Sequence, residues 1–400
     1  MANSDQHSNH IMHTYGRLPV EFVRGQGTQL FDTEGKSYID AISGIGVCAL
    51  GHAHPAVTQA ITHQAETLIH TSNIYHIGTQ QKLADKLCDI SGMDTVFFGN
   101  SGAEANEAAI KIARLHGNKQ GIDEPAIIVF DQSFHGRTIA TLTASGNRKI
   151  QAGFEPLVKG FIRAPFNDLE SVELLSKNKN IVAVLVEPVQ GEGGLNTPSK
   201  DFLTGLRGIC TANNWLLMLD EVQTGNGRTG QYFAYQHHNI LPDVVTTAKG
   251  LGNGVPIGAC LASGHAAKLM QPGSHGSTYG GNPLVCSAAL ATVTELTDGG
   301  VIQHAASQGE YFKTALETHL LPLENVKEVR TAGLMIGIEL THDCTTFVAK
   351  ALEQGVLINV TAGKVIRLLP PLIIQQADID TIISVLENLI KASIREPEAA

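Results

Sequence analysis

Short, uninterrupted apolar segments alternate with longer segments of helical periodicity in the middle of the chain. Around the apolar segments, hydrophobic residues recur every three or four positions, as in residues 105–113 and 203–210, which is the spacing of one helix face. Buried strands that alternate with helices predict an α/β fold with a mostly parallel sheet. The candidate strands are Ala126–Phe130, Ile181–Val186, Leu216–Asp220 and Val244–Thr247.

The two ends of the chain differ from the middle and predict a second, smaller unit. After a long helix expected over residues 282–297, the chain becomes richer in charge and contains two more candidate strands, Leu334–Leu340 and Val365–Leu368. The N-terminal segment has short strand signals between turns and is too small to fold alone, so we expect it to pack on the C-terminal unit. The expected organisation is an N-terminal segment at 1–55, a large domain at 56–311 and a small domain at 312–400.

Composition and charge exclude several classes of protein. Of the 400 residues, 43% are hydrophobic and only 16% are charged, which is the opposite of the balance in a disordered chain. The net charge of −10 repels a nucleic-acid backbone. The longest apolar run, Ile181–Val186, is far shorter than the roughly 20 residues that cross a bilayer. We therefore expect neither nucleic acid nor a membrane as a partner.

The cysteines and histidines favour a reduced, metal-free protein. Six scattered cysteines form no CxxC pair, so neither a disulfide framework nor a zinc site is expected. His52 and His54 have no third ligand nearby, and a hydrogen-bonded turn explains them better than a metal does. The polar first 14 residues resemble no targeting segment, so we expect a cytoplasmic protein.

A candidate anion site lies at the start of the alanine-rich segment. Ser101 and Glu104 have the spacing of a capping box, which begins a helix. Gly102 and Ala103 then fall in the first turn, where free backbone N–H groups suit a phosphate. The alternative is an ordinary capped helix.

Asp220 stands at the carboxyl end of one candidate strand, and Lys249 comes shortly after the end of another. The carboxyl ends of strands in an open α/β sheet line the ligand crevice. There Asp220 would be a metal ligand, a general base, the partner of a ligand cation or only a helix cap. A lysine leaving a strand among apolar neighbours has a lowered pKa and suits nucleophilic attack on a carbonyl, although most lysines are solvated surface charges.

A third glycine-rich segment, residues 275–283, carries Ser277 and Thr278 before the long helix. Small hydroxyl side chains in such a turn suit a phosphate or a carboxylate. A simple turn that leads into a helix is the alternative.

Taken together, the motifs resemble those of the class III pyridoxal-phosphate aminotransferases, and most closely the acetylornithine branch of that family. The resemblance implies fold type I: a large domain with a mostly parallel seven-stranded sheet, a small α+β domain built from both chain ends, and a homodimer with shared active sites. The segments that carry it are residues 14–20, 50–55, 100–109, 134–138, 187–194, 220–230, 249–258 and 367–372.

The resemblance also implies roles around a pyridoxal 5'-phosphate cofactor. Lys249 would be linked to the cofactor and would shuttle the proton, while Asp220 would keep the ring nitrogen protonated. The other cofactor contacts implied are Gly102 and Ala103 at the phosphate, Phe134 stacked on the ring, Gln223 at the ring hydroxyl, and the partner subunit's Thr278 at the phosphate.

For the substrates, the resemblance implies two arginine sites. Arg137, helped by Tyr15, would bind the α-carboxylate of acetylornithine, and Ser277 would lie near the acylated substrate. Arg367 would bind the α-carboxylate of 2-oxoglutarate or glutamate, and Glu192 would cover it when the other substrate is present.

Two further positions bear on this resemblance. Ile45 stands where ornithine aminotransferases carry a tyrosine, which argues against free ornithine as the substrate. Asn226 stands where an apolar residue is expected, a departure in a loop that affects no catalytic role.

The activity implied is N2-acetyl-L-ornithine:2-oxoglutarate 5-aminotransferase, a ping-pong reaction of arginine biosynthesis. Relatives that act on succinylornithine, N-succinyl-diaminopimelate or 4-aminobutyrate share the cofactor residues and remain alternatives. A non-catalytic protein that only binds the cofactor is a further alternative, but mere binding would not require the pair Glu192 and Arg367.

Overall fold

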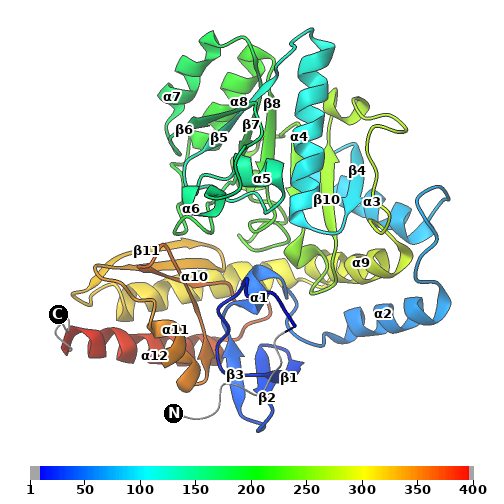
Figure 1. Ribbon diagram of the computed structural model, residues 1–400. Coiled ribbons are helices and arrows are strands. Elements are labelled where there is room, and N and C mark those ends of the chain that lie inside the picture. The colour runs from blue at the N-terminus through cyan, green and yellow to red at the C-terminus, as the bar shows by residue number, and fades with distance from the viewer. Residues whose placement is uncertain (1–9, 396–400) are drawn as a thin grey trace.

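The computed structural model describes residues 10–395 and places a seven-stranded sheet at the centre of the large part of the molecule (Figure 1). All neighbouring strands are parallel except β10, which runs antiparallel to both β4 and β9. The predicted α/β class with a mostly parallel sheet is therefore confirmed. In spatial order the strands are β4 (Thr95–Gly99), β10 (Gly258–Ala262), β9 (Val244–Thr247), β8 (Leu216–Asp220), β7 (Ile181–Val186), β5 (Ala126–Phe130) and β6 (Phe161–Ala164).

Helices cover both faces of this sheet, because its central strands are apolar on both sides. In β5, Ile127 packs in a cluster with α4, whereas its neighbour Ile128 packs in a cluster with α8 on the opposite face. The helices of this part are α2 (Pro55–Thr67), α3 (Gly78–Ser91), α4 (Gly102–Lys119), α5 (Ile139–Ala144), α6 (Arg148–Gln151), α7 (Leu169–Leu174), α8 (Phe202–Asn213) and α9 (Pro283–Thr297). Four short 3-10 helices are η1 (Leu175–Lys177), η2 (Ala234–His238), η3 (Lys249–Leu251) and η4 (Ala266–Lys268).

Two smaller sheets come from the chain ends and lie below the large part in Figure 1. The first contains β1 (Phe22–Gln26), β2 (Gln29–Asp32), β3 (Ser37–Asp40) and β13 (Val356–Leu357). The second contains β11 (Val326–Ala332), β12 (Met335–Leu340), β15 (Val365–Leu368) and β14 (Asn359–Thr361). β13, which comes from the C-terminal part of the chain, pairs in parallel with β3. The N-terminal strands therefore share a sheet with a C-terminal strand. The associated helices are α1 (Ser43–Gly46), α10 (Val301–His319), α11 (Phe347–Glu353) and α12 (Gln376–Arg395).

The boundary expected between residues 311 and 312 lies inside α10. The chain instead bends by 59° between α9 and α10, at Gly299 and Gly300, and α10 then packs against α12 and β11. The bend is a better dividing point because a continuous helix is a single rigid element. The outermost residues of the expected terminal segments, 1–9 and 396–400, lie outside the described residues.

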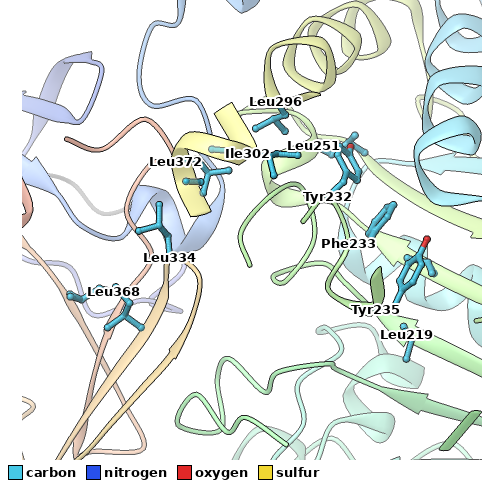
Figure 2. Close-up of a cluster of buried hydrophobic side chains, with 14 of the residues drawn as sticks. Leu219, Tyr232, Phe233, Tyr235, Leu251, Leu296, Ile302, Leu334, Leu368 and Leu372 are labelled. Carbon is cyan, nitrogen blue, oxygen red and sulfur yellow. The ribbon is translucent and has the colours of Figure 1, made fainter. Parts of the chain in front are cut away.

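One hydrophobic cluster joins the two parts (Figure 2). It runs from Phe233 and Leu251 in the large part, through Ile302 at the start of α10, to Leu334 and Leu368 in the small sheet. Packing within this cluster holds the end of β15 close to the segments that follow β8 and β9 in the large sheet. Within residues 10–395 no single helix is long and apolar enough to cross a membrane, whereas α9 and α10, bent as they are, pass the same length and composition test as a pair.

A strained turn connects the first small sheet to the large part. Ser43, Gly44, Ile45 and Gly46 all have positive φ angles, between 43° and 76°, which is costly for the two that are not glycine. Asp40 holds this turn, since its Oδ1 accepts hydrogen bonds from the backbone N–H of Ser43 at 2.8 Å. The other carboxylate oxygen of Asp40 lies 2.7 Å from Nε2 of His52.

This pair predicts a pH-dependent contribution to stability. The hydrogen bond to Asp40, with a further contribution from Cys48, raises the pKa of His52 to about 9. Because the pKa is raised in the folded state, the stabilisation is complete below pH ~6.5 and is lost as the pH rises through about 9. We expect His52→Gln to lower the free energy of unfolding by about 1–3 kcal/mol at pH 6 but by much less at pH 9.5.

Urea unfolding of the two proteins at both pH values measures this difference. His63→Gln, on an exposed part of α2, serves as the control. A His52→Gln effect of equal size at pH 6 and pH 9.5 would contradict the ionic contribution.

Candidate active site

A cavity of about 390 Å³ lies at the carboxyl ends of β7, β8 and β9, against the N-terminus of α4. It brings together eight of the predicted site residues, which come from five separate segments of the chain. These are Gly102, Ala103, Phe134, Arg137, Glu192, Asp220, Gln223 and Lys249.

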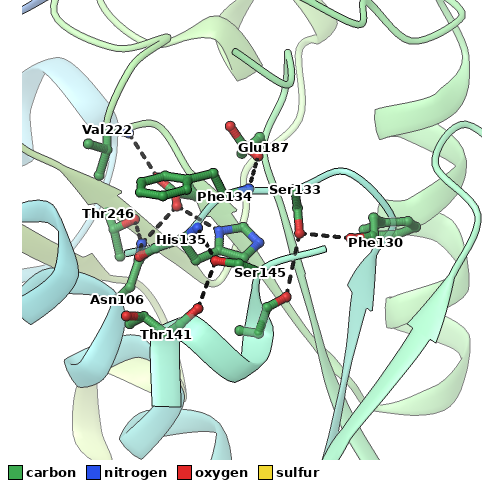
Figure 3. Close-up of polar contacts among 12 residues, drawn as sticks. Asn106, Phe130, Ser133, Phe134, His135, Thr141, Ser145, Glu187, Val222 and Thr246 are labelled. Atoms are coloured by element: carbon green, nitrogen blue, oxygen red, sulfur yellow. Dashed lines mark hydrogen bonds and ion pairs between the residues drawn. The ribbon is translucent and has the colours of Figure 1, made fainter. Parts of the chain in front are cut away.

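Asp220 is a buried carboxylate that the surrounding side chains hold in place. Figure 3 shows residues of this surrounding, among them Asn106, His135 and Thr246. Its Oδ2 accepts a hydrogen bond from Asn106 Nδ2 at 2.8 Å and lies 2.7 Å from Nδ1 of His135. Its Oδ1 accepts a hydrogen bond from the backbone N–H of Val222 at 3.1 Å. Thr246, on the neighbouring strand, donates to Asn106 Oδ1 at 2.7 Å and so fixes the amide. This arrangement presents a fixed negative charge to the cavity and suits a ligand cation.

The N-terminus of α4, where the sequence predicts an anion site, begins with a side-chain cap. Ser101 is the N-cap, and its Oγ accepts a hydrogen bond from the backbone N–H of Glu104 at 3.2 Å. The expected capping box forms only in part, because the carboxylate of Glu104 accepts from the backbone and side-chain nitrogens of Asn100 instead of from Ser101. Gly102 is needed here, since a Cβ would lie 2.8 Å from the side chain of Val222. The free N–H groups of this first turn face the cavity.

Lys249 lines the cavity directly after β9. Burial of its amine lowers its pKa to about 8, and the nearby charge of Glu192 partly opposes this effect. Asn226 donates hydrogen bonds to Thr247 Oγ1 and to the carbonyl of Ala248, at 2.9 and 3.0 Å. The polar residue that departs from the family pattern therefore supports the turn in which Lys249 has a positive φ of 45°.

The two predicted arginines differ in position: Arg137 lines the cavity, whereas Arg367 does not line it but contacts Glu192, which does. Arg367, on β15, is only 1% exposed, and its Nη1 donates to Glu192 Oε1 at 2.5 Å. Burial alone would raise the pKa of Glu192, but the charge and hydrogen bond of Arg367 outweigh that effect and lower it. Arg137 is exposed, and its guanidinium lies 5.5 Å from the ring centre of Phe134.

Besides Arg367, three predicted residues do not line this cavity in the same chain. Tyr15 is 76% exposed, and Ser277 and Thr278 line a separate cavity beside β4. Ser277 Oγ accepts hydrogen bonds from Asn100 Nδ2 at 3.2 Å and from the backbone N–H of Gly280 at 2.9 Å.

Sequence reasoning missed Asn106, His135 and Glu187, although each lies in a segment that it singled out. Glu187 directly follows β7 and Asp220 is the last residue of β8, so the strand-end argument applied to Asp220 also predicts Glu187. Its carboxylate accepts from the backbone N–H of Phe134 at 2.8 Å and of Gly191 at 3.4 Å. Burial, and then the nearby charge of Asp220, raise the pKa of Glu187 well above its usual value.

Comparison with known proteins identifies the family. The family model described as aminotransferase class-III matches residues 11–390. The chain belongs to the class-III aminotransferase family. The protein named acetylornithine aminotransferase in Nitrosomonas europaea is 54% identical over 96% of this chain and 98% of its own length. The protein of the same name in Aquifex aeolicus is 50% identical, over 95% of this chain and 100% of its own length.

Solved structures of other class-III aminotransferases have the same fold. Ornithine aminotransferase from Toxoplasma gondii superposes with a TM-score of 0.93 at 32% identity, covering 97% of this chain and 94% of its own. Acetylornithine aminotransferase from Elizabethkingia anophelis gives a TM-score of 0.85 at 34% identity, covering 96% of both chains. A second Toxoplasma structure, with a TM-score of 0.92 at 32% identity over 96% of this chain and 93% of its own, is described with PLP at partial occupancy in its active site. The predicted fold type I architecture is thereby confirmed.

The electrostatics of this aminotransferase site predict how Lys249 responds to its neighbours. The negative charge of Glu192 is the largest of the effects that raise the pKa of Lys249. Glu192→Gln removes this charge, so the pKa should fall further below about 8. In the cofactor-free protein, we expect the midpoint for trinitrobenzenesulfonate labelling of Lys249 to move down by about one pH unit.

Peptide mass spectrometry across a pH series measures that midpoint. Glu170→Gln, on the exposed side of α7, is the control. An unchanged or higher midpoint in Glu192→Gln would contradict the assignment.

Proposed function

We propose that this chain is an N2-acetyl-L-ornithine:2-oxoglutarate 5-aminotransferase that uses pyridoxal 5'-phosphate in arginine biosynthesis. The observation that carries the proposal is the buried Arg367, covered by Glu192, beside the cavity that contains Lys249. A carboxylate site that a side chain can cover or uncover allows one cavity to accept two substrates in turn. The names of the full-length relatives support the same substrate.

The cavity residues fit the cofactor group by group. The N-terminal turn of α4, at Gly102 and Ala103, suits the phosphate, and the half-buried Phe134 suits one face of the ring. Gln223 Oε1 is buried and has no hydrogen-bond partner among the residues that the structure describes, so a polar ligand group would satisfy it. Asp220 suits the ring nitrogen. When bound, the cofactor supplies a carbonyl that takes up the amino group and a protonated ring that withdraws electrons.

The chain's own groups then perform distinct tasks. Asp220, held by Asn106 and His135, keeps a negative charge opposite the ring nitrogen and stabilises the proton there. Lys249, whose amine has a pKa of about 8, holds or releases a proton at Nζ near neutral pH. Glu192 covers Arg367 while the substrate with a distal amine is bound, and it leaves Arg367 when the α-carboxylate of 2-oxoglutarate or glutamate enters.

Arg137 would bind the α-carboxylate of acetylornithine with Tyr15, and Ser277 would lie near its acyl group. We also propose a homodimer with shared sites, in which the partner subunit's Thr278 contacts the phosphate. The separation of Thr278 from the cavity of its own chain supports this arrangement.

The proposal also includes a division of the chain into domains and a cellular compartment. An N-terminal segment at 1–55 would pack on a C-terminal small domain, with the large domain between them ending at the bend after α9. All six cysteines are free, which supports a reducing compartment such as the cytoplasm.

Related substrates are the main alternatives. Succinylornithine, N-succinyl-diaminopimelate and 4-aminobutyrate place the same demands on the cofactor residues. Fold similarity does not separate them, because an ornithine aminotransferase superposes as well as the acetylornithine enzymes do. Sequence identity favours acetylornithine, at 50 to 54% for the two relatives above against 32% for that ornithine aminotransferase. A protein that only binds the cofactor would not need the pair Glu192 and Arg367.

A comparison of amine donors tests the proposed function. We expect kcat/KM with 2-oxoglutarate to be at least about tenfold higher for acetylornithine than for ornithine or 4-aminobutyrate. Free ornithine would bring a charged α-amine beside Arg137, and 4-aminobutyrate lacks the α-carboxylate that this arginine would bind. Succinylornithine completes the panel.

Arg137→Gln should reduce the preference for acetylornithine, whereas Arg148→Gln, an exposed position on α6, should preserve it. A highest value for 4-aminobutyrate would contradict the substrate assignment.

A further inference from the structure

Asn359 contacts Arg367 on the side opposite Glu192. Its Oδ1 accepts a hydrogen bond from Arg367 Nη2 at 2.7 Å, while Nη1 donates to Glu192. The two residues lie directly across from each other on the antiparallel strands β14 and β15. The guanidinium is therefore held by one partner that is charged and by another that is neutral.

These two partners differ in how firmly the fold holds them. Glu192 lies in a loop with glycine at positions 191, 193 and 194, and its side chain is 36% exposed. Asn359 is fixed by the register of β14 and β15, which also pairs Val360 with Ile366. The carboxylate of Glu192 can be displaced because it lies on a loop, whereas the amide of Asn359 stays in place on a strand. The two partners therefore suit different tasks.

The same strand also holds the backbone of the loop that carries Glu192. Thr361, two residues after Asn359, donates a hydrogen bond from Oγ1 to the carbonyl of Glu192. The side chain of Glu192 can therefore leave Arg367 while its backbone stays attached to β14. Uncovering the arginine needs a side-chain rotation and no movement of the strand.

We propose that Asn359 is a positioning and specificity-determining residue for the carboxylate site at Arg367. Its neutral amide fixes the plane of the guanidinium without cancelling the positive charge. When Glu192 moves away, Arg367 keeps its orientation and presents Nη1 to an incoming carboxylate. Arg367 Nε, which is buried and has no partner within residues 10–395, is a further donor at this site. The ligand class is the α-carboxylate of a 2-oxo acid.

This inference rests on the proposed role of Arg367 in the second half-reaction. An aspartate at position 359 would place a permanent negative charge on the guanidinium and would compete with the substrate carboxylate. Asn359→Asp should therefore weaken 2-oxo acid binding more than Asn359→Ala does, although aspartate retains the acceptor and nearly the same shape. A purely structural role for the amide predicts the opposite order.

The test uses the enzyme loaded with its cofactor and measures the two half-reactions separately, with acetylornithine and with 2-oxoglutarate. We expect Asn359→Asp to raise KM for 2-oxoglutarate by about 10- to 100-fold and Asn359→Ala by about 3- to 10-fold, with kcat nearly unchanged. The half-reaction with acetylornithine should stay close to wild type in both variants. Val360→Ala, the neighbouring position on β14, is the matched control for damage to the strand.

The outcomes separate this inference from the proposed function. An unchanged KM for 2-oxoglutarate in Asn359→Asp, or an equal loss in both half-reactions, would overturn the inference, provided that Arg367→Lys still raises that KM. If Arg367→Lys also left KM unchanged, the proposed role of Arg367 would be wrong and the inference would be overturned with it. A selective rise in Asn359→Asp that exceeds the effects of Asn359→Ala and Val360→Ala supports it.

Discussion

A carboxylate held away from water at the end of β8 is the constraint on which the site depends. Burying a charge is costly unless hydrogen bonds and a counter-charge stabilise it. Asn106, His135 and the backbone of Val222 contact Asp220, while burial and the nearby charge of Asp220 raise the pKa of the neighbouring Glu187. The fold thus keeps one defined anion that is suited to a protonated ligand ring.

The remaining charges come from both sheets, because the cavity lies at the carboxyl ends of the large sheet and the second small sheet supplies Arg367 to Glu192 in its lining. The large sheet supplies Asp220 and Lys249 at adjacent strand ends, and β15 brings Arg367 towards them. The hydrophobic cluster that crosses the bend between α9 and α10 holds the large sheet and the second small sheet together. Because Arg367 comes from the small sheet and Glu192 from the large part, their ion pair spans the junction between them.

Much of this architecture could be predicted from the sequence. The strands β5, β7, β8 and β9 coincide with the predicted ranges because each is a short segment buried on both faces and apolar apart from Asp220, Thr246 and Thr247. Contacts between distant residues could not be predicted in this way: Asn106 and Asp220 are 114 positions apart, and no local spacing relates them. The boundary predicted between residues 311 and 312 falls inside α10, because a change in charge along the chain does not mark the end of a helix. Whether Tyr15, Ser277 and Thr278 act in a partner's site depends on assembly, which single-chain periodicity does not encode.

We propose that Lys249, whose burial lowers the pKa of its amine, is the residue that carries the cofactor. Borohydride reduction of the protein loaded with pyridoxal phosphate, followed by peptide mapping, identifies the lysine that is linked to the cofactor. We expect to recover the label on the peptide that contains Lys249. Recovery of the label on any other lysine, or on none, would contradict it.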